Sequence, residues 1–336
     1  MEVIRSSHHS AFPMEDISRV GEARRHAVTL AMRAGFDEVK TGQLAIVVTE
    51  LGTNLIRHAQ RGTLLLAVRE QAGEVEAISI DHGPGMADIA RSMGDGFSTG
   101  GSLGAGLGTV RRMARDFDLH SSVPGGTVIV ARLAREAGPK AAGALEVGAV
   151  SVPKTGELVC GDAWAAAMAD PSATLAVVDG LGHGFDAAEA SAAAIDVFAA
   201  EAARDVTQML EKMHLRLRST RGAAVTLLRA DASTSRLRSC GAGNVSVRVV
   251  SGAYDRSMLM QHGTAGLQMR RPEPIEQDWP QHAMIIVHSD GIGTRWAPEV
   301  VLPVLGRDPT LAAALLFRDH SRGRDDATVA VLRRRM

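Results

Sequence analysis

The sequence is poor in aromatic residues and in cysteine. Aromatic side chains make up 3% of its 336 residues, which is too few for the stacking surfaces on which proteins bind single-stranded nucleic acid. Its two cysteines, Cys160 and Cys240, lie far apart in the sequence. They form neither a CxxC motif nor a disulfide framework, and this favours a reducing compartment.

The chain also has no excess of basic or acidic residues. The chain has 37 basic and 38 acidic residues and a formal net charge of -1, so no overall field favours nucleic acid or an anionic membrane. No apolar run approaches the roughly 18 residues of a membrane span, and the first residues lack the apolar core of a signal peptide. We therefore expect a cytoplasmic protein that binds neither nucleic acid nor membrane. Its length suggests two domains.

Glycines gather between Asp81 and Gly108. Gly83 and Gly85 follow Asp81, and a second cluster ends at Gly108. Glycine at this density weakens helices and strands, but it lets backbone N–H groups approach a ligand closely. A glycine-rich loop that opens a helix is a ready anion site, so the segment favours a nucleotide phosphate. Two ordinary glycine-rich turns are the alternative.

A polar stripe runs along an expected helix over residues 37–59. Glu50, Asn54 and His58 are each four residues apart and so share one helix face. A carboxylate there could orient or deprotonate an attacking hydroxyl, and one turn on an amide oxygen suits Mg²⁺. On this pattern alone, the stripe could equally be the wet side of the helix.

The first part of the chain predicts an α/β sandwich rather than a doubly wound sheet. We expect strands over residues 1–6, 63–69 and 75–80, a turn followed by a strand over 125–133, and helices over 17–34, 37–59 and 108–117.

Four motifs in order, ELGTN, DHGPGM, GAGLGTVRRM and GGTVI, resemble the N-box and glycine boxes of the GHKL ATPase and kinase superfamily. The segment DGFSTGGSLGAGLG is most similar to serine kinases of the RsbT type. The resemblance implies a GHKL (Bergerat) domain over residues 1–135 that binds ATP with Mg²⁺, with Glu50 as the catalytic base, Asn54 as the Mg²⁺ ligand and Asp81 as the partner of the adenine amino group. The other implied ATP-binding positions are Gly83, Gly85, Gly104, Gly106, Gly108 and Thr127.

A second domain is expected after a linker over residues 136–144. Strands are predicted over residues 145–152, 157–160, 173–178, 223–229, 245–250, 258–260, 284–288 and 327–333, and helices over 185–203, 206–219 and 298–317. Aspartates stand at the ends of these strands, namely Asp162, Asp179, Asp290, Asp325 and Asp326. An Asp-Gly pair alone is typical of a turn. Several convergent carboxylates instead suit a two-metal site with an attacking water.

Residues 145–336 resemble the PPM family of metal-dependent serine/threonine phosphatases, in its SpoIIE branch, and DGLGHG resembles the RsbX type. The resemblance implies an α-β-β-α sandwich that holds two Mn²⁺ or Mg²⁺ ions. The implied metal ligands are Asp162, Asp179, the carbonyl of Gly180, Asp290 and Asp325, with Asp326 as an alternative to Asp325. Asp179 would bridge both ions. The arginine that holds the substrate phosphate near the first strand of many members has no clear match here, and Lys154 is a poor substitute. The SpoIIE branch also lacks this arginine as a rule, which implies that the surface of the substrate protein supplies much of the binding.

The two resemblances together imply an α+β protein of two domains that acts as a bifunctional partner-switching regulator. The first domain would phosphorylate a serine or threonine of a STAS-domain antagonist or stressosome protein, and the second would remove such a phosphate. A sigma factor or a sensor phosphatase is a further candidate partner. The alternative is a first domain that binds ATP without transferring phosphate and only docks a partner or gates the phosphatase. The sequence leaves the oligomeric state open.

Overall fold

The computed structural model describes residues 1–5, 7–59, 62–93, 106–136 and 143–335. The chain divides into two compact units, one of His9–Lys140 and one of Met1–His8 with Ala141–Met336. The first domain was expected to begin at residue 1, but Glu2–Arg5 (β1) pairs antiparallel with Asp162–Ala169 (β8) of the other unit. The His9–Lys140 unit is therefore an insertion between β1 and the rest of the second fold.

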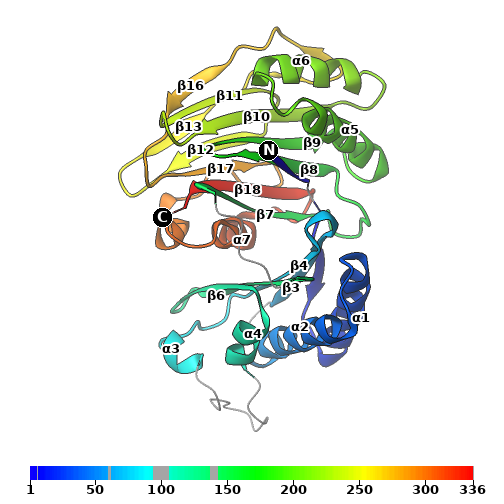
Figure 1. Cartoon of the computed structure of the whole chain (residues 1–336), viewed down its shortest axis with the longest axis vertical. Helices are drawn as coiled ribbons and strands as arrows, with labels where there is room; N and C mark the ends of the chain where they lie inside the picture. Colours follow the sequence, from blue (N-terminus) through cyan, green and yellow to red (C-terminus); the bar gives the residue numbers. More distant parts are fainter. Residues whose placement is uncertain (6, 60–61, 94–105, 137–142, 336) are drawn as a thin grey trace. The chain divides into compact units, whose positions relative to one another are not determined.

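In the His9–Lys140 unit, an antiparallel sheet is covered by two long helices (Figure 1). The strands lie in the order β2-β3-β4-β6-β5. They are β2 (Ser10–Pro13), β3 (Thr63–Arg69), β4 (Glu74–Ile80), β6 (Gly126–Ala134) and β5 (Asp116–Ser122). The helices are α1 (Ile17–Arg33), α2 (Glu38–His58), α3 (Ile89–Ser92) and α4 (Leu107–Met113), with a 3-10 turn at Glu70–Ala72.

The two long helices of this unit begin at aspartate caps. The Asp16 side chain accepts from the Ser18 amide, and the Asp37 side chain accepts from the Lys40 amide at 2.7 Å. Such caps satisfy backbone donors that have no partner inside the helix. One sequence prediction was wrong here: the helix expected over residues 108–117 ends at Met113, and Asp116 already begins β5.

The second unit is an α-β-β-α sandwich of two packed sheets. One sheet runs β1-β8-β9-β10-β11-β16 and the other β13-β12-β17-β18-β7, with β14 and β15 as a separate pair. The strands not yet placed are β7 (Leu145–Val152), β9 (Ser172–Gly180), β10 (Ala223–Asp231), β11 (Arg236–Ala242), β12 (Ser246–Val250), β13 (Asp255–Met258), β14 (Gly263–Thr264), β15 (Gln268–Met269), β16 (Ile275–Asp278), β17 (Met284–His288) and β18 (Ala327–Arg334).

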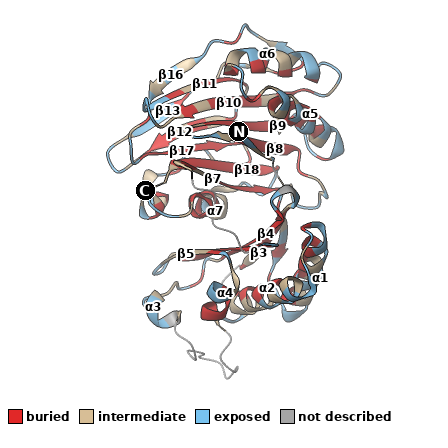
Figure 2. Cartoon of the chain, in the orientation of Figure 1, coloured by how far each residue is buried: buried red, intermediate tan, exposed pale blue. Residues whose placement is uncertain are grey.

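Helices cover the outer faces of this sandwich. Helix α5 (Phe185–Glu201) packs mainly on β8 and β9, α6 (Val206–Leu217) packs on β10 and β11, and α7 (Pro309–His320) packs on β7 and β18. Short 3-10 turns at Pro298–Val300 and Leu302–Val304 precede α7. Alternate residues of β8 face the two layers: Ala163 and Ala165 join the core beneath α5 and α6, and Trp164 joins the core between the sheets. The inner strands β8, β9, β17 and β18 are accordingly buried along most of their length (Figure 2).

Within the described ranges, no helix is both long enough and apolar enough to cross a membrane.

Candidate active sites

The first candidate site begins on α2. Glu50 and Asn54 are partly buried on one helix face, and His58 continues that face at the exposed last turn. Burial raises the pKa of Glu50, an effect that Arg57 partly opposes. A carboxylate with a raised pKa is better suited to accept a proton near neutral pH than an ordinary one.

Asp81 follows β4 and organises the loop beside this helix. Its Oδ1 atom accepts from the Gly83 amide at 2.6 Å and from the Thr127 amide at 3.2 Å. Thr127 is buried, and its hydroxyl lies 2.9 Å from that of Ser121. Asp81, Gly83 and Thr127 are thus brought together from two strands of the sheet, as the nucleotide assignment requires.

The glycines of this loop are required by close backbone contacts. A Cβ on Gly83 would lie 2.9 Å from the His58 carbonyl oxygen, so the loop lies against the last turn of α2. Gly85 has φ +75°, and a Cβ there would lie 2.1 Å from the Ser122 carbonyl oxygen. Any other residue would be strained and would clash.

The second glycine cluster is described in part. Gly106 caps α4, and Gly108 is buried within that helix, which packs on α2. Gly104 lies outside the described residues. The residues that are described fit ATP with Mg²⁺: an acceptor at Asp81 beside a buried hydroxyl, a glycine loop, and an amide oxygen with a carboxylate on α2. The individual assignments remain predictions.

The second candidate site begins with two opposed carboxylates. Asp162 is the first residue of β8 and lies directly opposite Asp179 of β9 in the antiparallel register. The strand expected before Asp162, over residues 157–160, is therefore wrong, because the strand starts at Asp162 itself. Like charges at directly opposite positions destabilise a sheet.

Burial and mutual repulsion raise the pKa of these acids. Burial raises the pKa of Asp162 well above its usual range, and the charge of Asp179 raises it further. Burial, followed by the charges of Asp290, Asp325 and Asp326, raises the pKa of Asp179 to about 7. Acids arranged in this way are typical of functional sites.

The adjacent aspartates before β18 have different surroundings. Asp326 is buried, and its two carboxylate oxygens accept from the amides of Lys154 at 2.8 Å and Gly161 at 3.0 Å. Asp325 is exposed and lines a pocket of about 640 Å³ together with Asp179 and Asp290. This difference favours Asp325 as the metal ligand and gives Asp326 the task of joining two loops.

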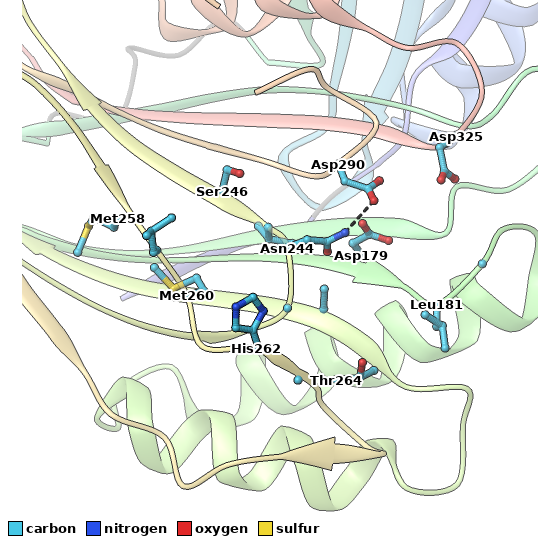
Figure 3. Close-up of a pocket in the computed structure, with 16 residues that line it drawn as sticks. Asp179, Leu181, Asn244, Ser246, Met258, Met260, His262, Thr264, Asp290 and Asp325 are labelled. Carbon is cyan, nitrogen blue, oxygen red and sulfur yellow. Dashed lines mark hydrogen bonds between the residues drawn. The ribbon is translucent and has the colours of Figure 1, made fainter. Parts of the chain in front are cut away.

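Two polar side chains at this site were not found from the sequence. Asn244 donates to Asp290 Oδ2 at 2.7 Å (Figure 3), and the buried Ser289 hydroxyl donates to Asp162 Oδ2 at 2.6 Å. Asn244 follows β11 in a glycine-flanked turn, which carries no metal motif of its own. The SDG segment could have drawn attention to Ser289, because it directly precedes Asp290.

Gly180 ends β9, His183 lies in the loop that follows it, and Lys154 follows β7. A Cβ on Gly180 would lie 2.2 Å from the Ala187 carbonyl oxygen, so glycine allows α5 to approach β9. The half-exposed His183 makes a 2.7 Å contact between its Nδ1 and Glu157 Oε1. Lys154 enters the site through its backbone amide. His183 and Lys154 thus have structural contacts here.

The donor set fits hard divalent cations, although the side chains are not gathered into a finished coordination sphere. In the part of the chain that the structure describes, no three His, Cys, Asp or Glu side chains converge closely enough to hold a metal ion as they stand. Oxygen ligands are those that Mg²⁺ and Mn²⁺ prefer. A divalent cation beside Asp162 and Asp179 would also relieve the repulsion that raises their pKa values.

These two folds define a nucleotide-binding domain and a PPM phosphatase domain on one chain. Residues 14–133 match the histidine kinase-like ATPase domain family, and residues 170–335 match the family of stage II sporulation protein E (SpoIIE). Through its first domain, the chain belongs to the histidine kinase-like ATPase family.

Two curated proteins of Bacillus subtilis (strain 168) are similar to the two halves. The serine/threonine-protein kinase RsbT is 36% identical over 111 residues, which cover 32% of this chain and 84% of RsbT. The phosphoserine phosphatase RsbX is 27% identical over 142 residues, which cover 41% of this chain and 70% of RsbX. The chain is thus similar to a kinase and a phosphatase in turn.

Solved structures agree with the fold of the second unit. RsbX in complex with magnesium superposes with a TM-score of 0.51 at 22% identity, over 56% of this chain and 95% of RsbX. A chain solved in work on the bacterial stressosome superposes with a TM-score of 0.53 at 28% identity, over 56% of this chain and 99% of that one. The expected α-β-β-α fold is confirmed.

Proposed function

We propose that the chain is a bifunctional regulator whose second unit hydrolyses phosphoserine or phosphothreonine on a signalling protein. The observation that carries the proposal is the group of acids around Asp179. Asp162 lies directly opposite Asp179 on the neighbouring strand, and Asp290 and Asp325 are close enough to raise the pKa of Asp179. The likeness to RsbX supports phosphoserine as the substrate.

In this reaction, a water oxygen forms a bond to phosphorus as the bond from phosphorus to the serine oxygen breaks. One water proton ends on the serine oxygen, which leaves serine and inorganic phosphate. Two divalent cations held by Asp162, Asp179, the Gly180 carbonyl, Asp290 and Asp325 would supply an activated water and neutralise developing charge. The protein orients these ligands: Ser289 holds Asp162, and Asn244 holds Asp290.

The first unit is proposed to transfer the γ-phosphate of ATP to a STAS-domain protein, in line with its likeness to RsbT. Asp81 would receive the adenine amino group, Asn54 would hold Mg²⁺, and Glu50 would orient the substrate hydroxyl and take its proton. Such transfer depends mostly on positioning and charge neutralisation. One chain would then add and remove phosphate on the same class of partner, at a high effective concentration.

A second candidate function is control of the phosphatase by nucleotide binding without transfer. The chain topology favours this candidate, because the His9–Lys140 unit, called the nucleotide unit below, is inserted between β1 and β7. Strand β1 pairs with β8, and the first residue of β8 is Asp162. A change in the inserted unit could therefore act on the second fold through two covalent connections.

The test separates the two candidates with one set of variants. Asp179→Asn is used as the background, so that transferred label is not removed again. With ATP labelled on its γ-phosphate and a STAS-domain protein, this variant should label the partner, and addition of Glu50→Gln should abolish the label. An unlabelled partner, with ATP still bound, sinks the kinase proposal.

The gating candidate has its own readout. Glu50→Gln alone should still bind ATP, and phosphate release from a prephosphorylated partner is compared with and without ATP. If ATP changes this rate in Glu50→Gln, and the change is absent when Asn54→Ala is added, gating is supported. An unchanged rate contradicts it. If the wild-type protein with Mn²⁺ releases no phosphate from the partner or from a phosphoserine peptide, the phosphatase proposal fails.

A further inference from the structure

A phosphoryl group that enters the second site meets mostly negative charge. The pocket contains Asp179, Asp290 and Asp325, with Asp162 and Asp326 beside them. Two divalent cations would not fully neutralise five carboxylates together with a phosphate dianion. Residues 145–161, which form β7 and the connection to β8, contain no arginine. An arginine from another part of the fold would therefore favour phosphate binding at this site.

Arg221 is not part of the pocket lining, but it lies beside a residue that is. Its Nη1 atom is 3.4 Å from the place that a Cβ on Gly182 would occupy, and Gly182 lines the pocket together with Asp179. The guanidinium is about half exposed, and its Nη2 atom lies 2.5 Å from Asp186 Oδ2. A guanidinium has five donors in a planar fork, so one ion pair leaves it able to bind an anion as well.

The backbone holds Arg221 in this place. The Leu181 amide donates to the Gly222 carbonyl at 3.0 Å, which continues the pairing of β9 with β10 beyond the strands and sets Arg221 opposite Gly182. The Gly222 amide in turn donates to the Thr220 hydroxyl at 3.1 Å. Gly182 has φ +90° and no side chain, so the Arg221 guanidinium lies close against the loop after Asp179.

We infer that Arg221 binds the substrate phosphate and that Asp186, at the start of α5, orients its guanidinium. This inference rests on the proposed phosphatase function and names a phosphate-binding residue for it. Arginine suits the role, because its fork matches the geometry of phosphate oxygens and keeps its charge at any working pH. The arginine comes from the turn before β10 rather than from the first strand.

The test compares Arg221→Met, Arg221→Lys and the control Arg218→Met, a nearby exposed arginine on the same connection. With Mn²⁺ present, each protein is assayed on a phosphoserine peptide and titrated with inorganic phosphate as inhibitor and, by calorimetry, as ligand. Arg221→Met should raise KM and weaken phosphate binding about 10- to 100-fold, with a smaller loss for lysine. Arg218→Met should match the wild type.

Each outcome decides one claim. If Arg221→Met keeps the phosphate affinity of the wild type, or lowers kcat alone, the inference is overturned. Weaker phosphate binding in Arg322→Met but not in Arg221→Met assigns the contact to the loop before Asp325 and also overturns it. If the wild type hydrolyses no peptide, the proposed function fails, while calorimetry with inorganic phosphate still tests Arg221.

Discussion

The buried acidic residues of the two units have neighbours of opposite charge. In the nucleotide unit, Glu76 is 2% exposed, and it accepts from Arg132 Nε at 2.5 Å and lies 3.1 Å from His9 Nε2. Burial alone would raise the pKa of Glu76, but Arg132, Arg69 and His9 outweigh it and lower the pKa to about 2. In the second unit, called the phosphatase unit below, burial and neighbouring acids raise the pKa of Asp179 to about 7.

The difference separates a structural cluster from a functional one. Glu76 carries its charge because arginines of the same unit compensate it. The acids around Asp179 face mainly one another, so their full ionisation needs cations from solution. A buried acid with a raised pKa and several acidic neighbours therefore marks a reaction site more reliably than burial does.

The largest effect is expected from Asp179→Asn. This change removes the acid that faces Asp162, Asp290 and Asp325, so metal-dependent release of phosphate from a phosphoserine peptide should fall at least about 1000-fold. Glu76→Gln is the control, because it neutralises a buried acid outside the phosphatase unit and should leave kcat within about twofold. Full activity in Asp179→Asn would show that the metal assignment is wrong.

Arg132→Met should destabilise the nucleotide unit by about 3–5 kcal/mol, because it leaves Glu76 buried without its main partner. Hydrogen exchange measured peptide by peptide follows residues 9–140. The exposed pair of Arg33 and Glu70 supplies the control, since Arg33→Met should cost less than about 1 kcal/mol.

An internal reference accompanies that measurement. All three tryptophans, Trp164, Trp279 and Trp296, belong to the phosphatase unit, so the unfolding transition seen by tryptophan fluorescence should not move in Arg132→Met. Unchanged exchange in the nucleotide unit would mean that the Arg132 pair contributes little to its stability.

The ion pairs around Glu76 also predict that the stability of the nucleotide unit depends on pH. The pKa of Glu76 falls from 4.5 to about 2 on folding, so its contribution is present above about pH 4.5 and is lost as the pH falls toward 2. The full contribution is on the order of 3 kcal/mol. Exchange protection of the nucleotide unit between pH 5.5 and 3 should therefore fall more steeply in the wild type than in Glu76→Gln. Parallel curves would contradict the assignment.

Strongly patterned elements were predictable from the sequence, and non-local pairings were not. The helix expected over residues 37–59 is α2, which runs from Glu38 to His58, because its caps and apolar spacing are local signals. Strand β8, DAWAAAMA, was missed because its alanines have low strand propensity. Its two faces are both buried, so no alternation of polar and apolar residues marks it. The pairing of β1 with β8 was invisible because it spans the whole inserted unit.

The same limit applies to the phosphatase site. Asp179, Asp290 and Asp325 stand in motifs, and all three line the pocket. The wall formed by Met258, Leu259 and Met260 comes from a segment without a motif. The sequence left open the choice between Asp325 and Asp326, because only the fold brings the amides of Lys154 and Gly161 to one of them.

The smallest effect is expected from a change at Asn244, a residue whose contact with the site was found only in the structure. Asn244 donates to Asp290 Oδ2, so Asn244→Ala should weaken Mn²⁺ binding about 10-fold and leave kcat at saturating Mn²⁺ nearly unchanged. Calorimetric titration with Mn²⁺ measures this, with Ser246→Ala as the control from the same pocket wall. An equal loss in both variants would indicate a general disturbance of the pocket. A loss confined to Asn244→Ala would indicate that orienting Asp290 is its task.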